Sequence, residues 1–555
     1  MKSRSKTLKR CAIAALIALL LTYTVLWIIL ANLSVSTHGS TDLNFGNIRV
    51  PSKRTIQWNQ RSPLMDSVMD GLAKKYRHNL KFDKDGGDRL FSQLATGQNI
   101  DEVNRILQQA EPWAKVGSNR DYDFTLCQLT LMLYNFGDRP EILHPQTVGH
   151  VVNVLMTEKG GEPVVFTPGI LGLPLRDTEN HVLMTEGSRY LTNQWIARHG
   201  NPDPQYDNSR NGLEAFLLDY LEGMERAGIH EYNSIPYVGY TLRSLLNIAS
   251  FAEGPIKEKA THILDRMNWD YALGSMALRR FPPFRRQFSR ARETNLDGDY
   301  HTSMMKAWMS LAGMDGLKIR HGQHHAMWVN YCSYRPADAV VEWVRSKPEE
   351  YFVRIGHGSD GSPEIYSGGP GFLITAGGVA DDFARQCVAR PTTLMLDDGA
   401  SDLRDLLHIE GPGDEIRSWN NTGVHRRFAV AAGPVSIPDE WSPSLTISGW
   451  SFYERAGQKI AVYAADELGI FCVLPKEGAL PEQAAKLAAA NADPDRLANE
   501  FIAPDATVIG YDVFAEKHLW VIESVAGSSL DRHHDGWPLS QGSVPGFSGD
   551  PSPSR

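Results

Sequence analysis

The feature that most constrains the fold of this chain is a single change in its hydrophobic periodicity. From about residue 119 to 313, apolar residues recur at the three- and four-residue spacing of amphipathic helices, with Gly, Pro and Asn clustered between the runs. After about residue 350, the apolar residues fall into short runs typical of strands. Because the two patterns are segregated along the chain, we expect an all-α domain followed by a β-sandwich.

The helical region divides into amphipathic segments that are expected to form successive helical hairpins. These segments span about 121–136, 146–157, 178–199, 210–227, 237–252, 256–277 and 300–312, and residues 60–118 have room for another pair. Strands are expected at 371–376, 428–431, 459–463 and 519–522. We therefore assign residues 34–345 to the helical domain, 346–527 to the β-sandwich, and the Ser-, Gly- and Pro-rich residues 528–555 to a disordered tail.

The N-terminus combines a basic segment with a long apolar run. Residues 1–10 carry five cations, and residues 11–33 are almost wholly apolar, which is long enough to span a bilayer. The positive-inside rule predicts a cytoplasmic stub at 1–10, a single transmembrane anchor at 11–33, and a periplasmic or extracellular body. A cleaved signal peptide is the alternative, but the apolar run is long for one and has no clean cleavage site at residues 31–34.

Charge and motif content exclude several classes of partner. The chain has a formal net charge of −9, which argues against nucleic acid or an anionic lipid surface as its main ligand. No Rossmann or P-loop fingerprint precedes a suitable helix, so we expect no nucleotide cofactor. The cysteines are few and widely spaced, and no disulfide framework or metal site is predicted from them.

Polar and aromatic residues cluster at every second predicted helix start. Consecutive antiparallel helices point in opposite directions, so the starts near residues 121, 178, 237 and 300 should share one rim of the helical domain. The clusters there are residues 120–123, 177–181, 231–240 and 295–301. Four such clusters at one rim are more than helix capping requires, and this rim is the predicted site.

Each cluster also has a structural interpretation that stays open. Glu179 is favourable in a first helical turn, and Asn180 could satisfy a backbone group of the preceding loop. The Glu231–Tyr240 cluster could simply tie down a loop, and Asp297 with Asp299 is better interpreted as a solvated turn than as a calcium site. His324 and His325 could line a cleft between the domains or only pack.

Several residues of these clusters resemble the motifs of a known family. An Asn180–His181 pair at a helix start, a tyrosine 57 residues later, and further histidines before a β-region in an exported chain resemble the polysaccharide lyases of the heparinase II/III and alginate lyase type. The likeness covers roughly residues 120–530. It implies an (α/α) toroid of helical hairpins followed by antiparallel β-sheets, and a uronic-acid-containing polysaccharide as substrate.

The resemblance also implies roles for individual residues. Asn180 would hold the substrate carboxylate, His181 would neutralise it or act as base, and Tyr237 would protonate the leaving oxygen, with Tyr240 as its substitute. The carboxylate of Glu179 beside this pair would repel a uronate unless it points away. The further candidates for substrate binding are Arg120, Glu179, Asn233, Arg243, His301, His324 and His325.

Two alternatives come from other interpretations of the same rim. A glycoside hydrolase would use paired carboxylates, either Glu179 with Glu231 or Glu231 with Asp297. A non-catalytic glycan-binding or scaffold protein would instead have its rim residues dispersed, or would occupy Asn180 and His181 with internal hydrogen bonds. The sequence leaves the glycan, its linkage and the activity of the site open.

Overall fold

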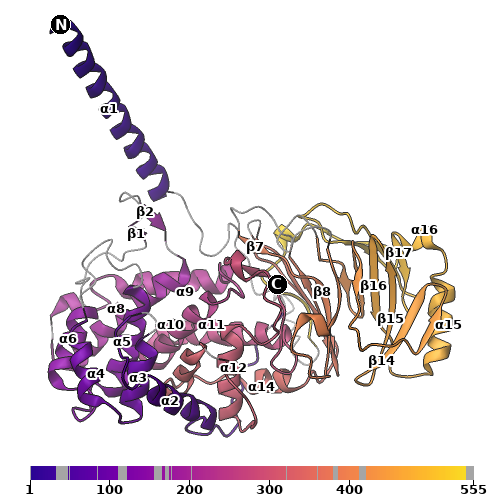
Figure 1. The fold of residues 1–555 in the computed structure, drawn as a ribbon, viewed down its shortest axis with the longest axis horizontal. Coiled ribbons are helices and arrows are strands. Elements are labelled where there is room, and N and C mark those ends of the chain that lie inside the picture. The colour runs from indigo at the N-terminus through magenta and orange to yellow at the C-terminus, as the bar shows by residue number, and fades with distance from the viewer. Residues whose placement is uncertain are drawn as a thin grey trace, which may run out of the picture.

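The computed structural model divides the chain into a helical half and a half built of antiparallel sheets, in that order (Figure 1). It describes residues 2–32, 48, 50–83, 86–110, 122–155, 166–168, 174–176, 178–201, 203–320, 322–358, 361–378, 386–411 and 420–544. The change from helices to strands falls between Arg345 and Tyr351. The segregated periodicity of the sequence therefore predicted the order of the two halves correctly.

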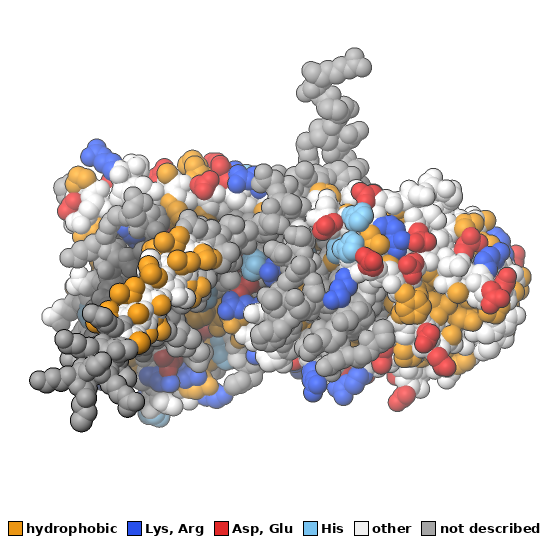
Figure 2. Space-filling model, turned by 90° about the horizontal axis from the view of Figure 1, so that it is seen from above, with side chains coloured by type: hydrophobic (Ala, Val, Ile, Leu, Met, Phe, Trp, Pro, Cys, Tyr) orange, Lys and Arg blue, Asp and Glu red, His pale blue; other side chains and the backbone are white. Residues whose placement is uncertain are grey.

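Helix α1 (Lys2–Asn32) is long and apolar enough to cross a membrane. Its apolar window, Cys11–Ile29, is not buried against the rest of the chain. In Figure 1 the helix projects from the body, and Figure 2 shows its apolar side chains gathered on the surface in orange. Exposure of this much apolar surface is unfavourable in water, so α1 is either a membrane anchor or a signal sequence.

The helices of the body lie close to the segments expected from periodicity. Residues 60–118 contribute more than the expected pair. The helical elements of the body are α2 (Pro63–Lys75), α3 (Gly87–Ala95), α4 (Ile100–Leu107), α5 (Tyr122–Phe136), α6 (Pro145–Leu155), α7 (Glu179–Val182), α8 (Ser188–Arg198), α9 (Leu213–Ala227), α10 (Tyr237–Phe251), α11 (Gly254–Leu273), α12 (Tyr300–Leu311), α13 (Trp328–Tyr331) and α14 (Asp338–Arg345).

The helix expected over 178–199 is interrupted by a π-helical turn, η2 (Leu183–Gly187), between α7 and α8. The three- and four-residue spacing of the apolar residues in this segment did not distinguish the turn from a continuous α-helix. The turn packs against α10, where a Cβ added to Gly187 would lie 2.9 Å from the Ile248 side chain. Single π-helical turns are frequently found at functional sites.

Helix α10 is the centre of the helical core. It contacts α5, α7, α11 and α12, and most of its residues are buried. Its apolar residues join one continuous core with the large buried side chains of Trp269, Trp308 and Trp328. Because α10 has neighbours on every side, the position of its first turn is closely determined.

An extended segment, residues 50–62, crosses the ends of the later helices. The Asp338 carboxylate at the start of α14 accepts hydrogen bonds from the Thr55 backbone N–H at 2.6 Å and from the Ile56 N–H at 3.2 Å. The Asn59 N–H donates to the Leu311 carbonyl at 2.9 Å, and the Ser62 N–H donates to Asn330 at 2.8 Å. These bonds fasten the chain that leads from α1 to the helical body.

The β half consists of antiparallel sheets. One sheet has the strand order β12-β9-β8-β6-β5-β4-β21, and its members are β4 (Tyr351–Ile355), β5 (Glu364–Gly369), β6 (Phe372–Gly377), β8 (Thr392–Leu396), β9 (Leu407–Ile409), β12 (Val435–Ser436) and β21 (Gln541–Ser543). A second has the order β10-β11-β16-β15-β14-β13, with β10 (Val424–His425), β11 (Phe428–Ala431), β13 (Leu445–Ile447), β14 (Trp450–Arg455), β15 (Gln458–Ala465) and β16 (Leu468–Val473).

These two sheets share one apolar core with a smaller sheet and two helices. The smaller sheet has the order β17-β18-β19-β20. Its strands are β17 (Glu500–Ile502), β18 (Val508–Tyr511), β19 (Ile522–Val525) and β20 (Ser528–Ser529), and the helices are α15 (Leu480–Ala490) and α16 (Pro494–Leu497). Two short strand pairs lie apart from these sheets, β1 (Phe166–Pro168) with β2 (Pro174–Arg176) and β3 (Phe284–Arg285) with β7 (Cys387–Val388).

The prediction of a disordered tail from residue 528 is wrong for residues 528–544. Strand β21 pairs with β4, with Gln541 opposite Arg354. The Arg354 guanidinium lies 4.4 Å from the ring centroids of both Trp520 and Trp537, so cation–π contacts hold this segment down. Composition over a short window cannot anticipate pairing with a strand almost two hundred residues earlier. Residues 545–555 lie outside the described residues.

We predict that Asp338→Ala lowers the free energy of unfolding by about 1–3 kcal/mol, because it leaves the backbone donors of Thr55 and Ile56 without their acceptor. Chemical denaturation of the full chain in detergent measures the change. Glu342→Ala, at an exposed position of the same helix, is the matched control and should change stability by less than about 0.5 kcal/mol. Equal effects of the two substitutions would contradict a fastening role for residues 50–62.

Candidate active site

Four helix starts meet at one end of the helical body. The ring of Phe124 in α5 lies 4.5 Å from that of Tyr240 in α10 and 5.8 Å from that of His181 in α7. The Tyr240 ring lies 6.4 Å from that of Tyr300, the first residue of α12. The ends that carry the predicted polar clusters are therefore adjacent in space. The predicted residue Arg120 lies outside the described residues.

Asp123 and His181 form a carboxylate–imidazole pair across this rim. The His181 Nδ1 atom is hydrogen-bonded to an Asp123 carboxylate oxygen. The Asp123 side chain is buried, whereas the His181 side chain keeps 21% of its surface exposed. A carboxylate on Nδ1 orients the ring and selects the tautomer that has its proton on this nitrogen. The Asp123 carboxylate therefore fixes the orientation and the tautomer of the His181 ring.

The carboxylate of Glu231 binds two residues that are distant in the sequence, Asn180, which precedes His181, and Arg286. Its Oε2 accepts a hydrogen bond from Asn180 Nδ2, and its Oε1 accepts one from Arg286 Nη1. Asn180 and the Glu231 side chain are fully buried, but the Arg286 side chain keeps 35% of its surface exposed. Asn180 is therefore occupied by an internal hydrogen bond, and Arg286 is the member of this group that can reach solvent.

Glu179 is buried directly beside this carboxylate. Its Oε1 accepts a hydrogen bond from the Glu231 backbone N–H at 2.8 Å. Burial, and next the nearby Glu231 charge, raise the pKa of Glu179 well above its ordinary value. The Glu179 carboxyl is thus favoured in its neutral form. A neutral Glu179 removes the repulsion that the sequence predicted between this residue and an acidic ligand.

Tyr237, the first residue of α10, faces the same arginine. The Arg286 guanidinium lies 4.6 Å from the centre of the Tyr237 ring, and the Gln287 side-chain amide donates a hydrogen bond to the Tyr237 hydroxyl at 2.8 Å. Tyr237 and Tyr240 are both half-buried, with ring centroids 6.4 Å apart. The Arg243 guanidinium lies against the Tyr240 ring at 4.8 Å and is itself buried.

The loop that carries Arg286 and Gln287 is held by both halves of the chain. It follows β3, which pairs with β7 of the β half, and the Arg286 N–H donates to the Gln386 carbonyl at 2.7 Å. Both residues have positive φ, 70° for Arg286 and 66° for Gln287, a conformation that costs energy for residues other than glycine. Consecutive strained residues held in place by their surroundings are characteristic of functional loops.

Arg286, Gln287 and Asp123 are residues of the site that were not predicted from the sequence. A signal for the loop was present, because residues 279–292 contain six arginines and no acidic residue in a chain of net charge −9. Asp123 was within a recognised polar cluster but could not be distinguished from a helix cap. What the sequence could not supply is the β3–β7 pairing that brings the arginine loop to α10.

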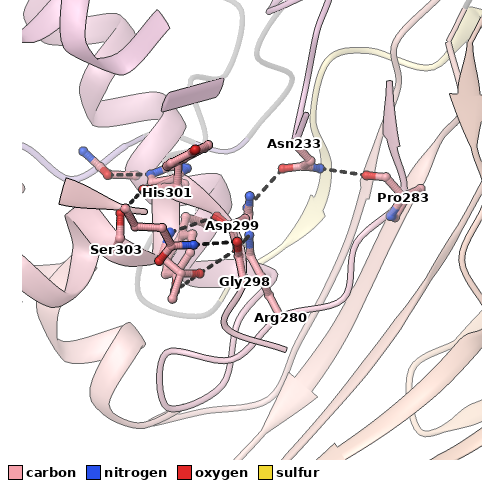
Figure 3. Close-up of polar contacts among 12 residues, drawn as sticks. Asn233, Arg280, Pro283, Gly298, Asp299, His301 and Ser303 are labelled. Atoms are coloured by element: carbon pink, nitrogen blue, oxygen red, sulfur yellow. Dashed lines mark hydrogen bonds and ion pairs between the residues drawn. The ribbon is translucent and has the colours of Figure 1, made fainter. Parts of the chain in front are cut away.

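Asn233 joins the rim to the β half through a second polar network. Figure 3 shows the part of this network that links Asn233 to Arg280 and Pro283. Its Nδ2 donates to the Glu364 carboxylate at 2.7 Å and to the Pro283 carbonyl at 3.1 Å, and its Oδ1 accepts from Arg280 at 3.1 Å. Arg280 also donates to Asp299 at 3.1 Å, which in turn caps α12. Asn233 therefore has a positioning role in this structure.

The predicted histidines lie deeper than the rim. His301 is buried and hydrogen-bonded to Asn268 Oδ1 at 2.9 Å, and burial lowers its pKa to about 3. His325 is buried with its ring 4.0 Å from that of Tyr300, and burial lowers its pKa well below the ordinary value. Both rings are therefore neutral side chains that support α12. His324, next to His325, is half-buried.

A cavity lies behind Asn233, between the helical and β halves. Its volume, counted as the space open to the centres of water molecules, is about 70 Å³, several times what one water needs. Its polar wall includes Asp270, His357 and Glu364, and burial raises the pKa of Asp270 to about 6. His357 is hydrogen-bonded to Glu364 at 2.7 Å. Across the described residues, no three His, Cys, Asp or Glu side chains are grouped to hold a metal ion.

Comparison with known proteins gives no assignment for this arrangement. No family model matches the chain, and no curated protein matches it significantly.

We predict that Glu179→Gln removes a pH dependence of stability. Because the pKa of Glu179 is raised in the folded state, this residue contributes to folding stability fully at pH values below its ordinary pKa of 4.5. That contribution is lost as the pH rises through the folded-state pKa. The free energy of unfolding of the wild type should therefore fall, relative to that of Glu179→Gln, between mildly acidic and mildly alkaline pH. Denaturation series across this range measure the difference. A constant difference between the two proteins would contradict a neutral Glu179.

Proposed function

We propose that this protein is a carbohydrate-active enzyme, and that it cleaves a uronic-acid-containing polysaccharide by β-elimination. The observation that carries the proposal is the grouping of His181, Tyr237 and Arg286 at one partly exposed rim. An elimination needs a base, an acid and a group that neutralises the substrate carboxylate. These three side chains supply one of each. The resemblance to heparinase II/III and alginate lyases led us to expect His181 and Tyr237 in this chemistry, with Asn180 in the place that Arg286 takes here.

The chemistry begins at the C5 hydrogen of the uronic acid, which is weakly acidic until the neighbouring carboxylate is neutralised. Arg286 provides a guanidinium that can pair with that carboxylate. The His181 imidazole, oriented by Asp123, takes the C5 proton. Electrons from the C–H bond form the C4–C5 double bond as the C4–O bond breaks, and the Tyr237 hydroxyl gives its proton to the leaving oxygen.

The proposal changes the role expected for Asn180. This residue was expected to hold the substrate carboxylate itself, but it is fully buried and its amide donates to Glu231. We assign carboxylate binding to Arg286 instead. Asn180 and Glu231 then position the guanidinium from below.

The local charge supports an acidic substrate. The arginine-rich residues 279–292 pass through the site, and the side chains of Arg286 and Arg290 keep 35% and 42% of their surface exposed. Arg286 and Arg290 are ion-paired with Glu231 and Glu293, and the guanidinium groups have further N–H donors that an acidic ligand can use. The neutral form of the buried Glu179 adds no repulsion.

The finer architecture and the location belong to the same proposal. We propose that the helical hairpins close into an (α/α) toroid and that the large sheets pack as a β-sandwich, since lyases of this type combine these two domains. We also propose that α1 is an uncleaved anchor with residues 1–10 in the cytoplasm and the body outside it. The five cations before an apolar run support this orientation.

A glycoside hydrolase is the second candidate, and one observation favours it. Glu179 and Glu231 are adjacent carboxyl groups in different environments, one favoured as the neutral acid and the other bonded to Arg286. Pairs of this kind divide the roles of acid and base in hydrolases. Both side chains are fully buried, whereas a hydrolase must present them to the sugar, so we rank this candidate second.

The full chain in detergent should release unsaturated uronate from at least one acidic polysaccharide in a panel of acidic and neutral glycans. Ultraviolet absorbance of the unsaturated product and new reducing ends are followed together. Tyr237→Phe and His181→Ala should each lower the rate by a factor on the order of 10²–10⁴, because each removes a proton-transfer group. Tyr206→Phe, at a half-buried position outside the rim, is the control.

The two product signals separate the candidates. Reducing ends without absorbance, abolished by Glu231→Gln, would replace the lyase with a hydrolase. Binding of a glycan with neither signal would favour a non-catalytic role of the rim, the alternative for which internal hydrogen bonds of Asn180 and His181, as found here, were expected.

We predict that the full chain stays in the membrane fraction after alkaline carbonate extraction, whereas a chain lacking residues 1–32 is released. The apolar window Cys11–Ile29 supplies the membrane affinity. Immunoblotting of both fractions measures the partition. If the protein expressed from the full sequence is recovered shorter by about the length of α1, α1 is a cleaved signal peptide instead.

A further inference from the structure

The Tyr237 hydroxyl has a partner to which the proposed reaction assigns no role. Gln287 Nε2 donates a hydrogen bond to the Tyr237 oxygen at 2.8 Å. Its Oε1 accepts a hydrogen bond from the Ser289 hydroxyl at 3.1 Å. The amide thus lies between the phenol and Ser289, with Nε2 toward the phenol.

This bond constrains the proton of Tyr237. A phenol oxygen that accepts an N–H must direct its own hydrogen toward a different acceptor. The Gln287 amide therefore aims the hydroxyl proton away from the loop. A donor on the phenol oxygen also stabilises the phenolate more than the phenol, since hydrogen bonds to charged acceptors are the stronger ones.

The backbone of Gln287 is fixed by its surroundings, which keeps its side chain next to the Tyr237 hydroxyl. It has a positive φ of 66° and directly follows Arg286, whose N–H is bonded to the Gln386 carbonyl at 2.7 Å. Among the described residues, the charged and titratable groups that face Tyr237 are Arg286, with Glu231 behind it, and Tyr240 on its own helix.

We propose that Gln287 is a positioning residue that aims the Tyr237 hydroxyl at the leaving oxygen and stabilises the phenolate left behind. The role in catalysis rests on the proposed elimination. There, the C5 proton goes to His181, the C4–O bond breaks, and the Tyr237 proton passes to the leaving oxygen. The resulting phenolate is neutralised when the proton held by His181 is returned through solvent, so the enzyme regains its starting state.

The test compares Gln287→Leu with Gln287→Glu in the full chain. Leucine removes the N–H donor, and kcat should fall on the order of 10- to 100-fold with KM unchanged, the loss typical of a hydrogen bond to a charged group. Glutamate keeps the shape of glutamine but presents an acceptor to the phenol, so kcat should fall at least as far. If Gln287 only packs, the Glu variant keeps wild-type kcat and the proposal is overturned. Gln205→Glu, at an exposed site, is the control.

A second measurement does not depend on activity. Crystal structures of the wild type and of Gln287→Leu compare the position of the Tyr237 side chain. Without the Gln287 N–H donor, the Tyr237 hydroxyl should move from the place it occupies in the wild type. An unchanged Tyr237 side chain would overturn the inference. If the wild type cleaves no glycan, the proposed function fails, and this comparison alone decides the role of Gln287.

Discussion

The site depends on one buried interaction, the carboxylate of Glu231 held between Asn180 and Arg286. A buried carboxylate is costly unless hydrogen-bond donors surround it, so its partners are kept close. Those partners come from α7 and from the loop after β3, while Glu231 itself precedes α10. One charged group thereby fixes the mutual positions of His181, next to Asn180, of Tyr237 and of the arginine loop.

The β half contributes to this arrangement although the rim is built of helices. The β3–β7 pairing holds the loop of Arg286 and Gln287, and Glu364 of β5 binds Asn233 two residues after Glu231. The strained backbone at Arg286, Gln287 and Asn233 is maintained by these contacts. The junction of the two halves is therefore part of the site, and it explains why a helical domain of this kind would be joined to sheets.

Periodicity in the sequence was sufficient for the helices and for their order relative to the sheets. It also placed Asp123, His181, Tyr237 and Tyr300 at one rim, because alternation of direction in helical hairpins needs no knowledge of side-chain contacts. It failed where a partner is distant in the sequence. The β21–β4 pairing and the approach of Arg286 to Glu231 depend on such partners. The π-helical turn at Leu183–Gly187 was missed for a different reason, because the apolar spacing there resembles that of a continuous helix.

The most direct test of the account is the crystal structure of Tyr237→Phe with an acidic oligosaccharide bound. We expect a uronate carboxylate within hydrogen-bonding distance of the Arg286 guanidinium, C5 of that sugar facing His181, and the glycosidic oxygen next to the ring at position 237. An oligosaccharide bound away from this rim, with the Arg286–Glu231 pair untouched by it, would contradict the account.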